Sequence, residues 1–387
     1  MRCIDELSPS ELKGKRVFLR TILNLPVTAE GAPEDVFRLK RALPTIEYLV
    51  KSGARTVIAG YFGRKGESIR PVAEALIKLA PELPIHFLGT PFTHVPAKVH
   101  ALKDGECLVI ENTRLDPGEE TNDPAFSEFL ASLADIFVGD AFPDAHRNYA
   151  SNVGIAKLLP SYAGFLMRDE VQHLDNARKP SSPSFAVLGG AKFETKSPLI
   201  HALLQTYDHL FIAGALANDV FKAKGHSVGR SLISAELPGY DVLSNTHLVS
   251  PVDVTVESPS KQARVKKPTE VADDDKIVDI GPDSVAAIAP LLTDAKFILW
   301  NGPTGLYEDG YISYTHAIAE LIEKAVAKGA TAVIGGGDTI AAIEDLIPEG
   351  KLGFLSTGGG SMLEYLLKGT LPAIEVLKEK EGEKSNQ

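Results

Sequence analysis

The sequence is poor in the features that mark several common classes of protein. Only two of its 387 residues are cysteine, Cys3 and Cys107, too few and too far apart in sequence for a disulfide framework or a metal knuckle. No apolar run is long enough to cross a bilayer, and the N-terminal residues lack the apolar centre of a secretory signal. The formal net charge of −11 argues against a nucleic-acid surface, because phosphate backbones bind clustered Lys and Arg. We therefore expect a cytoplasmic protein that binds neither membrane nor nucleic acid.

Short apolar runs alternate with helix-like segments along most of the chain, and the whole pattern occurs twice. Alternation of this kind predicts parallel strands joined by helices that cover both faces of a sheet. The apolar runs begin at Arg16, Arg55, Pro84, Cys107 and Asp135 in the first half, and at Ser184, His209, His247, Lys296, Thr331 and Leu352 in the second. We therefore predict the α/β class, with two similar doubly wound parallel-sheet domains.

The segment between the two halves predicts a connecting helix. Its apolar residues recur at helical spacing from Tyr162 to Leu174, and Pro180 ends the pattern. Farther on, the polar and charged stretch from Ser258 to Asp279 predicts a surface excursion with a hairpin. The predicted organisation is a first domain over residues 1–160, a hinge helix over 161–180 and a second domain over 181–369.

Two glycine-rich runs, residues 335–339 and 356–361, each follow a short apolar run and precede helix-like sequence. Glycine lets backbone N–H groups approach an anion closely, and the positive end of the following helix adds to the attraction. The sequence contains neither a Walker GxxxxGK(S/T) motif nor a Rossmann GxGxxG motif. We therefore predict a site for a nucleotide or another polyphosphate that is built differently from these two.

Further motifs are spread along nearly the whole chain. They are RTILNLP at Arg20, RLKRALPTI at Arg38, GRK at Gly63, IENTRLDPGEE at Ile110, DAFPDAHR at Asp140, LGGAKFETK at Leu188, WNGPTGLYE at Trp300, IGGGDT at Ile334 and STGGGSMLE at Ser356. Any one of these would be weak evidence. Together, in this order and at this spacing, they resemble the motifs of the phosphoglycerate kinase family.

The resemblance implies reversible phosphoryl transfer, in glycolysis, between 1,3-bisphosphoglycerate with ADP and 3-phosphoglycerate with ATP. It implies in-line transfer in a closed two-domain cleft, with Mg²⁺ present as Mg-ATP or Mg-ADP. The acceptor would bind to domain 1–160, onto which residues 370–387 pack back, and the nucleotide would bind to domain 181–369. The same resemblance leads us to expect a monomer. Two alternatives stay open, a related kinase for another small carboxylate and a catalytically silent homologue that binds nucleotide.

Two lysines, Lys192 and Lys196, follow a Gly-Gly pair and stand four positions apart. If a helix begins after the glycines, both project from one of its faces, which is also what a solvated surface helix would show. Phosphoryl transfer depends on positioning and on neutralising charge, so cations and glycines are the residue types that it needs. By resemblance, Lys192 escorts the transferring phosphoryl group and Lys196 holds the nucleotide phosphates.

Asp338 directly follows three glycines, where bound phosphates would repel a carboxylate unless a divalent cation lay between them. Mg²⁺ commonly takes one or two carboxylates together with phosphate oxygens and water. The resemblance gives Asp338 this metal role, with a cap on the following helix as the alternative. By the same resemblance, Glu308 accepts hydrogen bonds from the ribose hydroxyls, and the alternative is that Glu308 is an ordinary surface residue. The other nucleotide-binding residues that it implies are Gly214, Asn301, Gly336, Gly337 and Thr339, and the catalytic residues are Arg38, Lys192, Gly337 and Gly360.

Four arginines of the first half fall at or just beyond predicted strand ends, where ligands gather in parallel α/β sheets. They are Arg38, Arg64, Arg114 and Arg147. A forked guanidinium binds carboxylate or phosphate through two parallel hydrogen bonds, and 3-phosphoglycerate offers both groups. A surface ion pair is the alternative for each arginine. By resemblance, Arg38 neutralises the transferring group and positions the acceptor carboxylate. The other acceptor residues implied are Asn24, Tyr61, Phe62, Gly63, Arg64, Arg114 and Arg147.

The chain departs from the family pattern mainly at the acceptor side. Ile22 stands where the family has the Asp that reaches the substrate hydroxyl, and Tyr61 stands where it has His. Gly139 and Pro143 are further departures. Loss of one neutral hydrogen bond costs about 0.5–1.5 kcal/mol, whereas loss of an Arg or Lys clamp costs far more. We therefore expect a working kinase with altered affinity for its acceptor.

Overall fold

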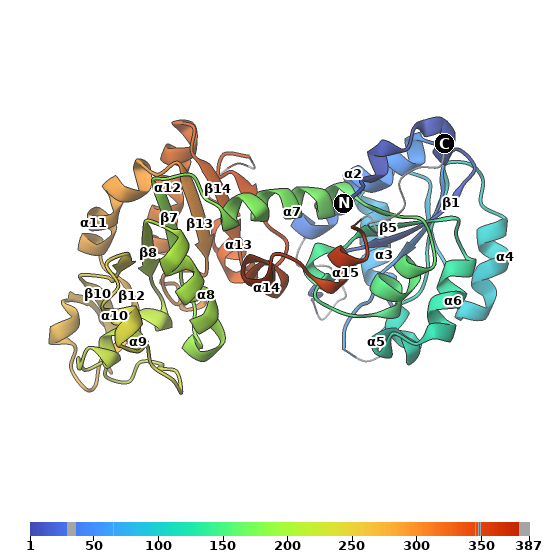
Figure 1. Ribbon diagram of the computed structural model, residues 1–387. Helices are drawn as coiled ribbons and strands as arrows, with labels where there is room; N and C mark the ends of the chain where they lie inside the picture. Colours follow the sequence, from blue (N-terminus) through green and yellow to red (C-terminus); the bar gives the residue numbers. More distant parts are fainter. Residues whose placement is uncertain (29–35, 65, 345, 347, 349, 379–387) are drawn as a thin grey trace. The chain divides into compact units, whose positions relative to one another are not determined.

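The computed structural model describes residues 1–28, 36–64, 66–344, 346, 348 and 350–378. Over these residues the chain forms two compact units (Figure 1). The first consists of Met1–Gln172 and the segment that begins at Thr370, and the second is His173–Gly369. Helix α7, Phe165–Arg178, contains the boundary between the two units.

In the first unit, the described strands pair in the order β3-β4-β2-β1-β5-β6, and every pair is parallel. The chain adds β2 on one side of β1 and later adds β5 on the other, so the direction of winding reverses between β1 and β5. Ligands bind beyond the carboxyl ends of strands at such a reversal. The elements are α1 Pro9–Leu12, β1 Arg16–Thr21, α2 Val36–Lys51, β2 Arg55–Ala59, α3 Arg70–Leu79, β3 Ile85–Phe87, α4 Val95–His100, β4 Cys107–Val109, α5 Gly118–Thr121, α6 Pro124–Ser132, β5 Ile136–Asp140, β6 Ser161–Ala163 and α15 Pro372–Glu375.

The second unit repeats this plan, with its described parallel strands in the order β15-β14-β13-β7-β8-β9. Here the winding reverses between β7 and β13, where Leu188 lies opposite Asn301. The elements are β7 Ser184–Leu188, α8 Phe193–Thr206, β8 His209–Ile212, α9 Ala215–Ala223, α10 Tyr240–Leu243, β9 Leu248–Val249, β10 Val254–Glu257, β11 Ala263–Lys266, β12 Lys276–Ile280, α11 Pro282–Thr293, β13 Phe297–Asn301, α12 Ser313–Ala327, β14 Thr331–Gly335, α13 Gly337–Ile343, β15 Phe354–Leu355 and α14 Gly360–Lys368.

Strands β10, β11 and β12 form a separate antiparallel sheet in the order β11-β10-β12. The pairing of β10 with β11 confirms the predicted hairpin. The apolar run that begins at His247 is divided, because its first part becomes β9 of the parallel sheet and its second part becomes β10. Pro251 stands between them and has no N–H to donate to a strand ladder.

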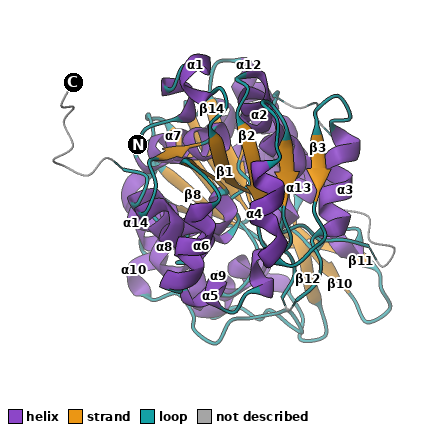
Figure 2. Ribbon diagram, turned by 90° about the vertical axis from the view of Figure 1, so that its right-hand side faces the viewer, coloured by secondary structure: helices purple, strands orange, loops and turns teal. Residues whose placement is uncertain are grey.

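The parallel strands are buried along nearly their whole length, as the continuous apolar runs of the sequence predict. Every residue of β7 and β13 is buried, and Trp300 of β13 is 0% exposed, with its indole N–H donating to the Gly302 carbonyl at 2.8 Å. Helices cover the sheets, so that the strands lie among them in Figure 2. None of the described helices is long and apolar enough to cross a membrane.

The connecting helix begins later than the sequence predicts. Ser161–Ala163 form the edge strand β6, in which Ala163 lies opposite Gly139 of β5. Helix α7 starts only at Phe165, whose amide donates to the Thr45 hydroxyl at 3.0 Å. The apolar residues before Phe165 therefore belong to an edge strand. The spacing of apolar residues alone does not distinguish such a short strand from the start of a helix.

The segment that follows Thr370 belongs to the first unit. The amide of Ala373 donates to the Ala145 carbonyl at 3.0 Å, and the Leu377 side chain lies against Gly139, leaving little room for a larger residue there. Of the predicted returning segment, residues 379–387 lie outside the described residues.

Candidate active site

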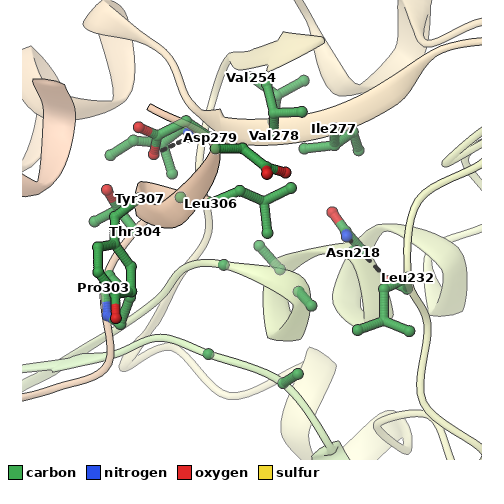
Figure 3. Close-up of a pocket in the computed structure, with 18 of the residues that line it drawn as sticks. Asn218, Leu232, Val254, Ile277, Val278, Asp279, Pro303, Thr304, Leu306 and Tyr307 are labelled. Carbon is green, nitrogen blue, oxygen red and sulfur yellow. Dashed lines mark hydrogen bonds between the residues drawn. The ribbon is translucent and has the colours of Figure 1, made fainter. Parts of the chain in front are cut away.

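A cavity of about 430 Å³ lies at the carboxyl edge of the second parallel sheet (Figure 3). The loops that follow β7, β8, β13 and β14 reach it through Gly190, Gly214, Pro303 and Asp338. The antiparallel sheet and nearby segments add an apolar wall, which includes Leu232, Val254, Ile277, Val278, Ile280 and Leu306. The lining of the cavity therefore combines glycine loops and acidic residues with aliphatic side chains.

The glycine loops at this edge are packed against one another through their backbones. A Cβ atom at Gly189 would overlap the Pro303 carbonyl oxygen, and one at Gly214 would come within 2.7 Å of the Gly190 nitrogen. The Gly214 amide donates to the Thr304 carbonyl at 3.1 Å, and the Leu216 amide donates to the Gly190 carbonyl at 3.0 Å. Because Gly214 also has a φ of +61°, only glycine suits this approach.

The two predicted phosphate lysines have different environments. Helix α8 begins at Phe193, so Lys192 lies before it at the cap position, exposed and with a left-handed φ of 67°. Lys196 lies in the first turn and donates to the Gly189 carbonyl at 2.7 Å. The condition under which both would project from one helix face is not met, because the helix starts after Lys192 rather than directly after the glycines.

The surroundings of Lys196 lower the pKa of its ammonium group. Burial of the ammonium group lowers its pKa to about 8, and the negative charge of Asp338 opposes this shift. A Cβ atom at Gly190 would come within 2.8 Å of Lys196 Nζ, so the ammonium group lies directly against the glycine loop. Anionic phosphates bound at this loop would stabilise the protonated form.

Asp338 lies exposed at the second position of α13, after Gly336 at the cap and Gly337 at the first position. The position excludes the alternative that Asp338 is the N-cap of this helix. The neighbouring Tyr307 has a raised pKa, mainly because of burial and then because of the charges of Asp338 and Glu308. Among the described residues, no three His, Cys, Asp or Glu side chains gather as a metal cage. One exposed carboxylate beside a glycine loop suits Mg²⁺ that arrives with phosphate oxygens and water.

The other residues predicted for the nucleotide site either pack within the loops or leave their backbone exposed. Asn301 is buried at the end of β13, and the Thr339 hydroxyl accepts a hydrogen bond from the Gly302 amide at 2.7 Å. Gly336, with a φ of 98°, packs against both. Gly337 and Gly360 are the first residues of α13 and α14, and both are exposed with open space where a Cβ would stand.

A buried ion pair occupies the winding reversal of the first unit. Arg20, at the end of β1, is 0% exposed, and its guanidinium pairs with Asp144 at 3.0 Å. It also donates to the Ser151 hydroxyl at 3.0 Å and to the Thr21 carbonyl at 2.7 Å. The Tyr61 hydroxyl donates to the second oxygen of Asp144 at 2.8 Å. Sequence reasoning missed Asp144, although a buried arginine at the end of a strand calls for a buried acid nearby.

Arg114, predicted to bind the acceptor, is held by protein groups. It donates to the Gly63 carbonyl at 2.5 Å and to the Tyr149 hydroxyl at 2.8 Å, and it pairs with Glu120 at 2.9 Å. Its guanidinium also lies 3.8 Å from the centre of the Tyr61 ring. Tyr61 thus acts as a platform between Arg114 and the buried ion pair.

Two asparagines hold the loop that carries Phe62 and Gly63. The Asn24 carboxamide oxygen accepts from the Gly63 amide at 3.2 Å, and Asn112 bonds both the amide and the carbonyl of Phe62, at 3.0 and 2.7 Å. Phe62 itself is buried. Asn112 was not among the predicted residues, although it stands two positions before Arg114 in the same motif.

The remaining predicted acceptor residues differ in exposure. Arg64 and Arg147 are exposed, and Arg38 is half-buried on α2. Ile22, at 1% exposure, belongs to the core of the first unit. The substitution that most separates this chain from the family pattern therefore adds a packed apolar side chain.

The sequence profile of the family described as "Phosphoglycerate kinase" matches residues 5–369. The chain belongs to the phosphoglycerate kinase family. The phosphoglycerate kinase of Prochlorococcus marinus (strain MIT 9211) is 37% identical to it, over 98% of this chain and 99% of the relative. Phosphoglycerate kinase 3, cytosolic, from Arabidopsis thaliana is also 37% identical, with the same shares covered.

Solved structures of phosphoglycerate kinases share the fold. The enzyme from Coxiella burnetii has a TM-score of 0.80 at 35% identity, and that from Pyrococcus horikoshii OT3 has 0.82 at 28%. Each match covers 97% of this chain and 98% of the other. Together with the two parallel sheets, these matches confirm the predicted α/β class and the kinase assignment.

Proposed function

We propose that this chain catalyses the glycolytic reaction of its family, the reversible transfer of a phosphoryl group between 1,3-bisphosphoglycerate with ADP and 3-phosphoglycerate with ATP. The observation that carries the proposal is the cavity among the glycine loops of the second unit, in a chain that matches the family over residues 5–369. The related-kinase and silent-homologue alternatives are not favoured by these matches.

In this proposal the nucleotide lies in the cavity, with its phosphates at the glycine loops and near Lys196. Helices α8 and α14 begin at these loops and present the positive ends of their dipoles. Exposed Lys192 follows the transferring group, while Gly337 and Gly360 offer backbone N–H groups to it. Glu308 lines the cavity and receives the ribose hydroxyls.

Kinases of this family use nucleotide substrates and are generally Mg²⁺-dependent. We propose that Asp338 contributes the protein ligand to that ion, with the phosphates supplying others. When bound, the ion neutralises charge on the phosphate oxygens, and Asp338 fixes where that charge is held.

The acceptor is proposed to bind to the first unit, at the carboxyl ends of β1 and β5. Arg38, Arg64 and Arg147 meet the anionic groups directly, while Arg114 is pre-oriented by Tyr149, Gly63 and the Tyr61 ring. In-line transfer requires the two half-sites to come together, so nucleotide and acceptor must act jointly. The expectations of a monomer, a cytoplasmic location and no membrane or nucleic-acid partner stay predictions.

The test is a coupled assay of ADP release from Mg-ATP with a panel of small carboxylates, run beside calorimetric titration of Mg-ADP. We expect 3-phosphoglycerate to be the acceptor with the highest kcat/KM. A higher kcat/KM for another carboxylate would overturn the acceptor assignment. Intact Mg-ADP binding without turnover on any acceptor would leave a silent homologue, and absence of Mg-ADP binding would overturn the nucleotide site.

A further inference from the structure

One polar atom in the apolar part of the cavity has no partner. Asn218, on helix α9, lines the cavity and is only 3% exposed. Its carboxamide nitrogen donates to the Leu232 carbonyl at 3.0 Å, whereas no described residue donates to its oxygen. Buried acceptors of this kind are rare, and each one calls for a ligand or another polar partner.

The bond to Leu232 determines which way the carboxamide faces. Turning the group by half a turn would place its oxygen against the Leu232 carbonyl oxygen, so that two acceptors would meet. The nitrogen therefore stays on the Leu232 side, and the oxygen faces away from Leu232 toward the cavity (Figure 3). The unpartnered atom on the cavity side of Asn218 is therefore a hydrogen-bond acceptor.

The segment that carries the Leu232 carbonyl is itself anchored to helix α9. Ser234 donates to both oxygens of Asp219, through its amide at 2.7 Å and its hydroxyl at 2.8 Å. The same hydroxyl accepts from the Phe193 amide at 2.8 Å, at the start of α8. Because Asp219 is the neighbour of Asn218, these bonds tie the segment with the Leu232 carbonyl to the part of the helix that carries the carboxamide.

The surroundings of Asn218 select the part of a nucleotide that can reach it. Leu232, Val254, Ile277 and Leu306 make this part of the cavity apolar (Figure 3). The glycine loops, which suit phosphates, contribute Gly190 and Gly214 to the lining, and Lys196 lies against Gly190. A nucleotide whose phosphates occupy the loops therefore places its flat, largely apolar base among the aliphatic side chains.

We propose that Asn218 reads the nucleobase, its oxygen accepting a hydrogen bond from the 6-amino group of adenine. This inference rests on the proposed function, since it requires a nucleotide in the cavity. A 6-oxo purine presents a carbonyl oxygen at the same place, where it would oppose the Asn218 oxygen. A purine without a 6-substituent leaves that oxygen without a donor. Asn218 is thus a specificity-determining residue for 6-amino purines.

The experiment is calorimetric titration of the full-length protein with three Mg-nucleotides: ADP, IDP and purine riboside diphosphate. We expect ADP to bind about tenfold more tightly than the other two, as for one hydrogen bond to a buried acceptor. In Asn218→Leu, which removes the acceptor at similar size, the three dissociation constants should agree within about twofold. The control Val254→Ala shortens the apolar wall without touching the acceptor, so it should weaken all three nucleotides by a similar factor.

Equal binding of the three diphosphates to the parent protein would overturn the inference, and this comparison needs no variant. Retention of the ADP preference by a folded Asn218→Leu protein would overturn it as well. Failure of the parent to bind any of the three would instead overturn the proposed nucleotide site. Steady-state kinetics give a second readout. In the parent protein, recognition of the base by Asn218 should make KM higher for ITP than for ATP, while kcat is the same for the two nucleotides.

Discussion

The Tyr61 hydroxyl donates a 2.8 Å hydrogen bond to one oxygen of Asp144, whose other oxygen pairs with the buried Arg20 at 3.0 Å. The Arg114 guanidinium lies 3.8 Å from the centre of the Tyr61 ring. Burial and the charge of Asp144 raise the pKa of Tyr61, so the phenol stays protonated and keeps donating. One aromatic residue thereby joins an ion pair in the core to an arginine predicted to bind substrate.

Removal of Asp144 should be costly because Arg20 would keep its charge in the protein interior. We expect Asp144→Ala to lower the free energy of unfolding by about 3–5 kcal/mol. Tyr61→Phe removes only a hydrogen bond to a charged group and should cost about 1.5–3 kcal/mol. Urea unfolding measures both. The half-exposed pair Arg16–Asp135 offers the control, since Asp135→Ala should cost about 1 kcal/mol or less, and equal effects of Asp135→Ala and Asp144→Ala would contradict the buried-pair account.

Ile22→Asp would restore the residue type that the family pattern has at this position. At 1% exposure, the new carboxylate would be buried among apolar side chains without an arranged partner. We expect the variant to lose several kcal/mol of stability, whereas Ile22→Val should lose about 0.5–1.5 kcal/mol. Thermal unfolding with and without 3-phosphoglycerate is the measurement. A stable Ile22→Asp protein with a lower KM for 3-phosphoglycerate would show that the side chain reaches the substrate after all.

Lys192 should be needed for turnover and unhelpful for stability. Its left-handed backbone, with a φ of 67°, strains any residue with a Cβ. Lys192→Gly should therefore be more stable than Lys192→Ala by about 0.5–1 kcal/mol, while both variants lose most of kcat and keep their affinity for nucleotide. Chemical denaturation, stopped assays and calorimetry separate the three quantities. Near-parent kcat in either folded variant would end the catalytic assignment.

Lys196 should make nucleotide binding depend on pH. In the free protein its pKa is about 8, below the ordinary 10.5, and bound phosphates should raise it again. Nucleotide affinity should therefore be highest below pH 8 and fall as pH rises from 8 toward 10.5, where the free protein has lost the proton. The phosphates are already ionised over this window. Calorimetric titration of ADP is the measurement, and a matching decline in Lys196→Met would assign the effect to another group.

Asp338→Asn should separate metal binding from nucleotide binding. The variant keeps the shape of the side chain but loses its negative charge beside the phosphates. We expect affinity for Mg-ATP to fall about tenfold, while affinity for metal-free ATP stays the same or rises because a repulsion is removed. Titrations with and without a chelator measure both values. Unchanged affinity for Mg-ATP would argue against Asp338 as a metal ligand.

The parallel strands could be predicted from the sequence because burial on both faces leaves continuous apolar runs such as that at Ser184. The glycine loops could be predicted too, since close backbone approach requires glycine wherever it occurs. The start of α8 could not, because a lysine in left-handed conformation is unusual and depends on the loops around it. Nor could periodicity show that Ser161–Ala163 would take a sheet edge instead of beginning α7.

The ion pair of Arg20 with Asp144 and the unpartnered carboxamide oxygen of Asn218 could not be predicted from the sequence, for a different reason. Both depend on residues that are distant or unremarkable in sequence, such as Leu232, whose contribution is only a backbone carbonyl. The family pattern pointed to Ile22 as a substrate position, yet burial of that side chain depends on the packing of the whole first unit. Family motifs locate a site, and tertiary contacts decide how each side chain serves it.

The first unit is completed by a segment that follows the whole second unit in sequence, through the bond from Ala373 to Ala145 and the packing of Leu377 on Gly139. During synthesis, the residues that begin this unit leave the ribosome first, but the contacts of Ala373 and Leu377 can form only after the second unit has been synthesised. The second unit, His173–Gly369, has all its residues in one stretch and can complete its sheet earlier. The unit that begins second along the chain is thus the first whose residues have all been synthesised.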